Sequence, residues 1–176
     1  MTLSYADAAA QITAPGERYE THEITVNGVT YTAFKGAPGT LRELFDLTTL
    51  YGDTEYLVYE DERYTFTEVH AHAAGLAAAL VNRYGVRKGD RVAIAMRNYP
   101  EWIMTYIGAL AAGAVVVSMN AWWTAEELAY GLEDSGTTVL VADAERVQRT
   151  RDSAARLGIR TIGVRLPDGD NPEGVD

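Results

Sequence analysis

Short apolar segments alternate with amphipathic segments between residues 64 and 166, and this alternation constrains the fold more than any other feature of the chain. Four segments are rich in β-branched residues and as short as buried strands: 91–96, 114–118, 138–141 and 159–164. Segments with helical spacing of their apolar residues lie before and between them, at 66–84, 99–112, 125–133 and 144–157. Strands that alternate with helices form βαβ units around a mostly parallel sheet. The sequence therefore predicts an α/β fold with helices on both faces of that sheet.

The first 63 residues follow a less regular pattern. The dipeptide Asn27-Gly28 separates two alternating segments and supplies the two positive-φ positions of a tight hairpin turn. Two helices and two short strands are also predicted, at 4–12, 40–51, 56–59 and 63–65. We expect residues 1–63 to form a variable hairpin and helix region in front of the alternating region 64–166.

The last ten residues, 167–176, are acidic and rich in Gly and Pro. This composition is typical of a loop, so we expect a linker or disordered tail without core positions. Residues 1–166 then form one subdomain. A chain that stops in a linker is expected to be part of a longer protein.

Composition excludes several functions. With 25 acidic and 15 basic residues and a formal net charge of −10, the chain lacks the basic face that nucleic acids and anionic membranes require. The absence of cysteine excludes disulfides, thiolate metal sites and cysteine nucleophiles. The first residues lack the features of a signal peptide, so we expect a cytoplasmic protein. Glycines interrupt the apolar segment 102–119, which favours a helix and a buried strand over a membrane span.

Four predicted helix starts carry a Thr or Asn three residues before a Glu, the pattern of a capping box. In this device the first side chain accepts a hydrogen bond from the third amide, and the carboxylate returns one. The four pairs are Thr40 with Glu43, Thr65 with Glu68, Asn98 with Glu101, and Thr124 with Glu127. We therefore interpret these glutamates as helix caps rather than as catalytic acids or bases.

Other residues that could carry chemistry also have structural explanations. His70 and His72 lie two apart on a helix, so their side chains diverge and no metal site is expected. The stretch 135–138 resembles the start of a phosphate loop but lacks the later glycine and lysine, and Gly136 is expected to end a helix. Ser118 lacks a nucleophile elbow and marks a strand end. We predict no catalytic residue and no metal ligand in this chain.

Five motifs, in order and at suitable spacing, resemble the early part of the adenylate-forming enzymes. They are residues 64–69, 85–94, 98–102, 108–120 and 124–135. This superfamily includes acyl-CoA synthetases, acyl-AMP ligases and the adenylation domains of peptide synthetases. The motifs at 98–102 and 128–135 are most similar to those of fatty-acid–CoA ligases. The resemblance implies that the chain is the N-terminal portion of a larger adenylate-forming fold.

The resemblance also implies a reaction with ATP, Mg²⁺ and CoA, in which a carboxylic acid becomes an acyl-AMP and then an acyl-CoA. The family's ATP-binding and catalytic segments lie downstream of the residues present here. The fragment alone is therefore expected to be inactive and to hold none of these molecules. Its implied partners are the remainder of the same enzyme, a fatty or related acid, ATP and CoA. Because a divided sheet leaves an edge uncovered, self-association as a homodimer is also expected.

One loop carries a more specific expectation. Family members often continue from the position of Asn120 with Pro-Arg, and that arginine can lie near the CoA phosphates. Here Ala121 and Trp122 follow, so we expect the cation to be absent. Asn120 and Trp122 are the candidate residues for a CoA or acyl channel, with packing of Trp122 and Trp123 as the alternative.

Two other functions stay open at this point. One is an acyl-AMP ligase that loads a carrier protein. The other is a stand-alone, non-catalytic α/β binding module.

Overall fold

The computed structural model describes residues 3–169 and 174–176. The chain divides into two compact units, unit 1 (Met1–Leu44) and unit 2 (Phe45–Asp176), and the division falls inside helix α2 (Leu41–Asp46).

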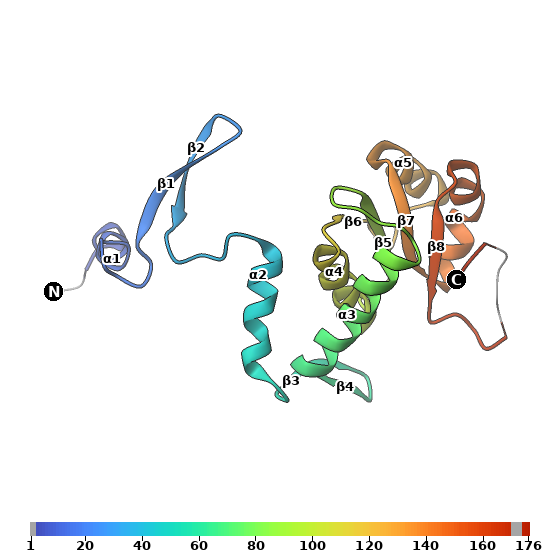
Figure 1. The fold of residues 1–176 in the computed structure, drawn as a ribbon, viewed down its shortest axis with the longest axis horizontal. Helices are drawn as coiled ribbons and strands as arrows, with labels where there is room; N and C mark the ends of the chain where they lie inside the picture. The colour runs from blue at the N-terminus through green and yellow to red at the C-terminus, as the bar shows by residue number, and fades with distance from the viewer. Residues whose placement is uncertain (1–2, 170–173) are drawn as a thin grey trace. The chain divides into compact units, whose positions relative to one another are not determined.

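Unit 1 contains a short helix and a β-hairpin, which precede α2 along the chain (Figure 1). Helix α1 (Tyr5–Ile12) begins at Ser4, whose hydroxyl accepts a hydrogen bond from the amide of Asp7 at 3.2 Å. Strands β1 (Thr21–Val26) and β2 (Val29–Phe34) pair antiparallel. The turn residues Asn27 and Gly28 have φ of 50° and 80°, which confirms the predicted turn.

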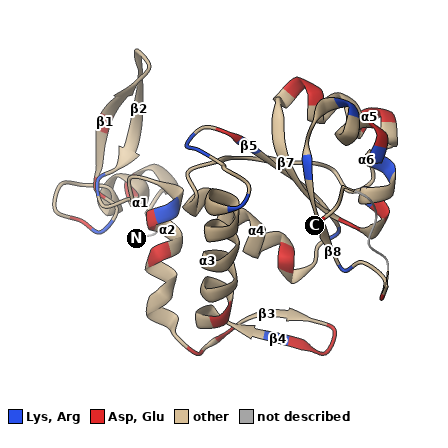
Figure 2. Cartoon of the chain, turned by 45° about the vertical axis from the view of Figure 1, so that its right-hand side comes forward, with Lys and Arg blue, Asp and Glu red and all other residues tan. Residues whose placement is uncertain are grey.

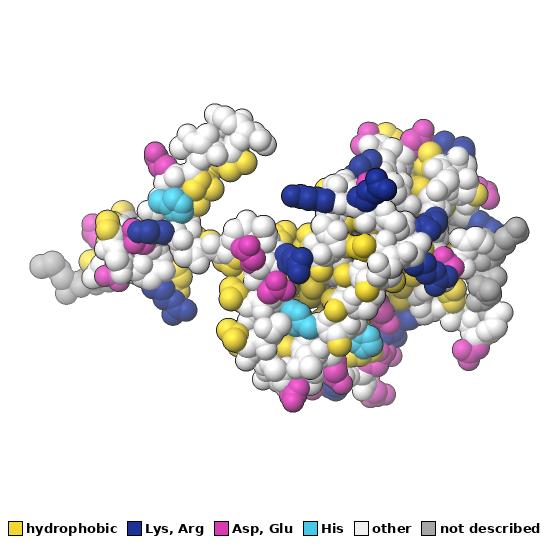
Figure 3. All heavy atoms as spheres, viewed as in Figure 1, with side chains coloured by type: hydrophobic (Ala, Val, Ile, Leu, Met, Phe, Trp, Pro, Cys, Tyr) yellow, Lys and Arg dark blue, Asp and Glu magenta, His cyan; other side chains and the backbone are white. Residues whose placement is uncertain are grey.

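The hairpin has one apolar face. Ile24 is paired with Tyr31 and Val26 with Val29, and residues two apart on a strand point to the same side. Figure 3 shows apolar side chains along the hairpin, and three of these four residues are exposed.

Unit 2 is built on a parallel four-stranded sheet. Its strands, in spatial order, are β6 (Val115–Ser118), β5 (Arg91–Ala95), β7 (Thr137–Asp143) and β8 (Arg160–Val164). Every neighbouring pair runs parallel. The four predicted strands and their parallel arrangement are therefore confirmed.

Helices cover both faces of this sheet. They are α3 (Phe66–Asn82), α4 (Pro100–Ala111), α5 (Ala125–Ser135) and α6 (Ala144–Leu157). Val92 and Ile94 of β5 pack in one cluster with Leu80 of α3, whereas Ala93 and Ala95 pack in another with residues of α5 and α6. Successive residues of β5 thus point to opposite faces of the sheet and belong to two separate cores. This is the arrangement predicted for a sheet with helices on both faces.

A second hairpin lies beside α3. Strands β3 (Glu55–Tyr59) and β4 (Glu62–Thr65) pair antiparallel and lead directly into that helix. The helix predicted over 40–51 is only partly correct, because α2 gives way to a 3₁₀ helix at Leu47–Tyr51. The hydroxyls of Thr48 and Thr49 donate to carbonyls three residues earlier, each at 2.7 Å, and so favour the tighter turn.

The capping prediction is correct at two helices. Thr65 with Glu68 and Thr124 with Glu127 form complete capping boxes. At α2 the Thr40 hydroxyl accepts from the amide of Glu43 at 3.1 Å, but the carboxylate of Glu43 accepts from the amide of Gly39 instead.

The capping prediction is wrong at α4. Helix α4 begins at Pro100, so Tyr99 takes the cap position and Asn98 lies outside the helix. Proline is favoured at the first helical position because it has no amide hydrogen to satisfy. Glu101 is thereby released from capping, and its carboxylate binds the Arg165 guanidinium instead.

The prediction that 167–176 adds no core position is wrong for Val175. This residue packs against the α5–α6 cluster and forms a parallel bridge with Thr161 of β8. The amide of Gly163 donates to the carbonyl of Asp176 at 2.8 Å, and the Asp176 amide donates to the Thr161 carbonyl at 2.9 Å. The outer edge of β8 offers free backbone groups, and the returning tail satisfies them. Residues 170–173 lie outside the described part of the chain.

No helix within residues 3–169 and 174–176 is long and apolar enough to cross a membrane. The apolar segment 102–119 forms most of α4, a turn at Gly113 and strand β6. In the cartoon of unit 2, Lys and Arg are scattered among Asp and Glu (Figure 2).

Gly108 allows α3 and α4 to pack closely. A Cβ atom at this position would lie 2.8 Å from the carbonyl oxygen of Ala73 and 3.3 Å from Leu76.

We predict that Gly108→Ala lowers the free energy of unfolding by about 1–3 kcal/mol, because the backbone must move to admit the methyl group. Gly75→Ala on α3 is the matched control, since nothing lies within 4 Å of its added Cβ. The control is expected to stabilise by about 0.5–1 kcal/mol in urea unfolding. Equal effects of the two substitutions would contradict this account.

Candidate functional site

The candidate site lies at the carboxyl ends of the parallel strands. From β5 the chain crosses to β6 on one side, and from β7 it crosses to β8 on the other side. In open α/β sheets, ligands bind at the carboxyl ends of strands where the connections diverge in this way. The loops at this place follow β5 (96–99) and β6 (119–124), and Asp143 ends β7.

A buried ion pair connects these loops. The side chains of Asp143 and Arg146 are 6% and 2% exposed, and Arg146 Nη1 lies 3.2 Å from Asp143 Oδ2. Asp143 Oδ1 also caps α6, because it accepts from the amide of Arg146 at 3.0 Å. Asp143 Oδ2 accepts from the amide of Arg97 at 3.0 Å. Both carboxylate oxygens are therefore satisfied, and one of them holds the loop after β5.

The guanidinium of Arg146 holds the loop after β6. Its Nε donates to the carbonyl of Ala121 at 2.8 Å, and its Nη2 donates to the same oxygen. Nearby, Arg149 Nη1 donates to the carbonyl of Trp123 at 2.8 Å. Two arginines of α6 thus fix the backbone between residues 121 and 123.

The predicted site residues Asn120 and Trp122 lie in this loop and contact each other. Asn120 Oδ1 accepts a hydrogen bond from the Trp122 amide at 2.9 Å, which stabilises a tight local turn. Trp122 is 70% exposed, so it is not a packing anchor. Trp123 is half-buried and packs against the α5–α6 core, so the packing alternative is correct for this tryptophan alone.

Arg97 is the site residue that sequence reasoning missed. Its guanidinium carbon lies 4.2 Å from the centroid of the Trp122 ring, a cation–π contact. The loop after β6 itself contains no Lys or Arg, as the sequence indicated, and the cation beside Trp122 comes from the loop after β5. Within residues 3–169 and 174–176, no carboxylate forms an ion pair with Arg97, although it is exposed at the end of β5. The sequence offered one signal for Arg97, which is that it directly follows the predicted buried strand 91–96.

A cavity of about 480 Å³ opens between these loops and the β3–β4 hairpin. It is lined by Tyr59, Arg97, Asn98, Tyr99, Ala121 and Trp122. The Tyr59 and Tyr99 rings meet edge to face, with centroids 5.5 Å apart. Partial burial, together with the charge of Glu60, raises the pKa of the Tyr59 hydroxyl, so this group stays neutral and able to donate. The cavity thus combines aromatic faces with a cation that pairs with no carboxylate of the described residues.

A larger cavity of about 610 Å³ lies between α6 and the tail residues Gly174 and Val175. Its lining includes Arg160, at the amino end of β8, rather than the loops that carry the predicted site residues. We therefore take the smaller cavity as the candidate site.

His70 and His72 contact other side chains. His70 Nε2 lies 2.8 Å from Thr48 Oγ1, and the His72 ring meets Tyr64 edge to face. In the part of the chain that the structure describes, no three His, Asp or Glu residues are grouped to hold a metal ion. The backbone amide of Thr65 donates to Glu68 and lowers the pKa of that carboxyl, which suits a helix cap.

The phosphate-loop lookalike is a helix end, as predicted. Gly136 has φ of 62° and ψ of 41°, and it closes α5 in the left-handed conformation. The guanidinium of Arg91 occupies the adjoining space, where Arg91 Nε donates to the Ser135 carbonyl at 2.9 Å. Ser118 ends β6, also as predicted.

Residues 46–173 match the family described as AMP-binding enzyme. This match begins almost where unit 2 begins, at Phe45.

Three curated relatives are CoA ligases. The chain is 37% identical to 4-coumarate–CoA ligase 3 of Oryza sativa over 103 residues, 58% of this chain and 18% of that protein. It is 33% identical to the crotonobetaine/carnitine–CoA ligase of Salmonella paratyphi A over 141 residues, 74% of this chain and 27% of the relative. It is 36% identical to the long-chain-fatty-acid–CoA ligase of Salmonella typhimurium over 102 residues, 57% and 18% of the two chains. The matches thus span between about a sixth and a quarter of the relatives' length.

A solved structure supports the fold. Coronafacic acid ligase from Pectobacterium brasiliense superimposes with a TM-score of 0.69 over 76% of this chain and 27% of that chain, at 21% identity. This likeness confirms the α/β fold.

The buried ion pair offers a direct test of how the loops are held. We predict that Asp143→Asn lowers the free energy of unfolding by about 3 kcal/mol, because it leaves the Arg146 charge buried without its main partner. The lower end of the usual range applies, since half-exposed Glu145 still contacts Arg146 at 2.9 Å. Urea unfolding measures the change. Glu133→Gln removes the exposed pair with Arg156 and serves as control, with an expected cost below about 1 kcal/mol. A cost for Asp143→Asn no larger than that of the control would refute the structural role of the pair.

Proposed function

Because this chain belongs to the AMP-binding enzyme family, we propose that it is the N-terminal part of an ATP-dependent acyl-CoA synthetase. In the proposed reaction, a carboxylate oxygen attacks the α-phosphorus of ATP and expels pyrophosphate. The sulfur of CoA then attacks the acyl carbon and expels AMP. The family match and the three CoA-ligase relatives support this proposal.

The proposed substrate is a fatty acid or a related carboxylic acid. Support comes from the similarity of residues 98–102 and 128–135 to fatty-acid–CoA ligases and from the long-chain-fatty-acid–CoA ligase among the relatives. The coumarate ligase, at 37% identity, and the carnitine ligase, at 33%, extend the proposed range to carboxylic acids other than fatty acids.

The cavity beside Trp122 is the proposed contact site for the nucleotide half of CoA. The observation that carries this assignment is the Arg97 guanidinium, 4.2 Å from the Trp122 ring centroid and without a carboxylate partner in the described residues. A guanidinium donates to phosphate oxygens, and an exposed indole offers a face on which adenine can stack. Asn120 would orient Trp122 through its hydrogen bond to the backbone.

ATP and Mg²⁺ are assigned to later parts of the enzyme. The described residues contain no glycine-rich phosphate loop and no group of carboxylates suited to a cation. Unit 2 would act as scaffold for an acyl-activating centre, and residues 167–176 would connect it to those later parts.

The proposed location of the protein is the cytoplasm. The proposal also includes a homodimer, which the open edge at β6, where Val115 is 51% exposed, would favour.

We predict that the 176-residue chain catalyses no ATP–pyrophosphate exchange with any fatty acid, because its described residues hold no ATP site. The protein encoded by a reading frame that continues past Asp176 should show exchange with a subset of a carboxylic-acid panel, and should form an acyl-CoA with that subset. Transfer to a carrier protein instead of CoA would favour the acyl-AMP ligase. Exchange by the short chain, or no exchange by the longer protein with any acid, would sink the proposal.

The nucleotide contact can be tested on the chain itself. We predict weak binding of 3′-phosphoadenosine 5′-diphosphate, the nucleotide half of CoA, measured by quenching of tryptophan fluorescence at low salt. Arg97→Gln should weaken it about tenfold, or about 1.4 kcal/mol, through loss of a charge-assisted hydrogen bond.

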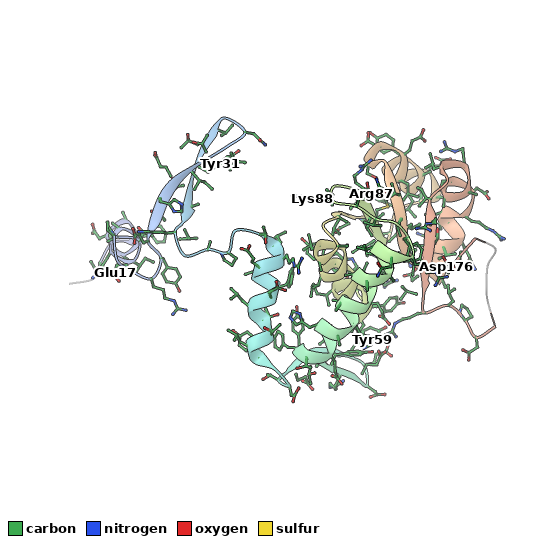
Figure 4. The ribbon with its side chains drawn as sticks, viewed as in Figure 1. Glu17, Tyr31, Tyr59, Arg87, Lys88 and Asp176 are labelled. Carbon is green, nitrogen blue, oxygen red and sulfur yellow. The ribbon has the colours of Figure 1, made fainter. Side chains whose placement is uncertain are left out.

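Arg87→Gln is the matched control, because Arg87 is exposed and carries the same charge at the opposite end of unit 2 from Tyr59 (Figure 4). Equal weakening by both variants would indicate general electrostatic attraction and no site at Trp122.

A further inference from the structure

Arg165 follows strand β8 and connects three separate elements. Its Nε lies 2.9 and 3.0 Å from the two carboxylate oxygens of Glu101 in the first turn of α4. Its Nη2 donates to Glu62 Oε2 of β4 at 2.8 Å. The same Glu62 oxygen accepts from the Tyr64 hydroxyl at 2.7 Å. One guanidinium therefore ties the β3–β4 hairpin to α4 and to the end of the sheet.

The same guanidinium contacts both tyrosines of the cavity wall. Its central carbon lies 5.0 Å from the ring centroid of Tyr59 and 4.9 Å from that of Tyr99. These distances are within the range of cation–π attraction. Tyr59 lines the cavity from the end of β3, Arg97 and Tyr99 from the loop after β5, and Trp122 from the loop after β6.

The backbone at Arg165 adopts an unfavourable conformation. Its φ of 51° lies in the left-handed region, where a residue with a Cβ atom is disfavoured. The side chain is 29% exposed, so its bonds to Glu62 and Glu101 are partly shielded from water. The bond to Glu101 raises the pKa of Arg165 above its usual value, so the charge is permanent.

We propose that Arg165 is a positioning residue that holds Tyr59 and Tyr99 as one rigid wall of the cavity and thereby sets its affinity for the nucleotide. This inference rests on the proposed function for its ligand, but not for its geometry. The contacts of Arg165 are made with the hairpin, the start of α4 and the two tyrosines, and none of those described is made with a buried residue of the sheet. Its removal should therefore loosen the wall and leave the core intact.

The test compares Arg165→Gln with Arg165→Lys by hydrogen exchange and by binding of 3′-phosphoadenosine 5′-diphosphate. Arg165→Gln should raise amide exchange in residues 55–65 about tenfold, leave β5 and β7 unchanged, and weaken binding about fivefold. Arg165→Lys keeps the charge but loses the planar group that spans two carboxylates and two rings. Arg165→Lys should therefore show a smaller rise in exchange and a smaller loss of binding than Arg165→Gln.

Arg156→Gln is the matched control, because Arg156 forms an exposed ion pair with Glu133 on the α5–α6 side. It should change neither exchange in residues 55–65 nor binding. Arg165→Gly relieves the backbone at φ 51° and still removes the guanidinium, so it should behave like Arg165→Gln.

The outcomes separate the two proposals. If the unsubstituted chain binds no nucleotide, the proposed contact site fails, and the exchange data alone decide whether Arg165 holds the wall. Unchanged exchange in residues 55–65 overturns the positioning role. So does a rise that is equal in β5 and β7, which indicates general destabilisation, or full binding by a loosened Arg165→Gln variant.

Discussion

The ion pair between Asp143 and Arg146 is the interaction on which the carboxyl end of the sheet depends. A charge removed from water is stable only if it is paired and its hydrogen-bonding capacity is used, and here both requirements are met within one turn of α6. The remaining hydrogen-bonding groups of the pair bind the two loops: Asp143 accepts from the Arg97 amide, and Arg146 donates to the Ala121 carbonyl. The two loops with the exposed functional groups are thus both anchored to the same pair of buried charges.

Local patterns predicted most helices and strands of the chain well. Period-two and helical spacing located the strands and helices because burial on both sheet faces leaves a strong signal, and Asn27-Gly28 located the hairpin turn. Prediction failed where a residue had two competing partners. Asn98 and Glu101 have capping spacing, yet Pro100 shifts the helix start by one residue and Arg165, 64 positions away, takes the carboxylate.

The candidate site was only half predictable for a related reason. Asn120 and Trp122 stood out because they lie where the resembling family often has Asn-Pro-Arg, but Arg97 contacts Trp122 from a different loop. No spacing rule links two loops that meet only because β5 and β6 are neighbours in the sheet. Val175 was missed in the same way, since the edge that it covers exists only once β8 is in place.

The left-handed backbone at Arg165 has a meaning for comparison among relatives. Glycine would relax the main chain at this position, whereas arginine satisfies the carboxylates and the two rings, so the requirements of backbone and side chain oppose each other. A homologue with glycine there would keep the same sheet and helices but would need other contacts to brace its tyrosines. The residue at this position would therefore distinguish family members with a rigid binding surface from those with a more flexible one. Overall sequence identity and fold similarity do not reveal this difference.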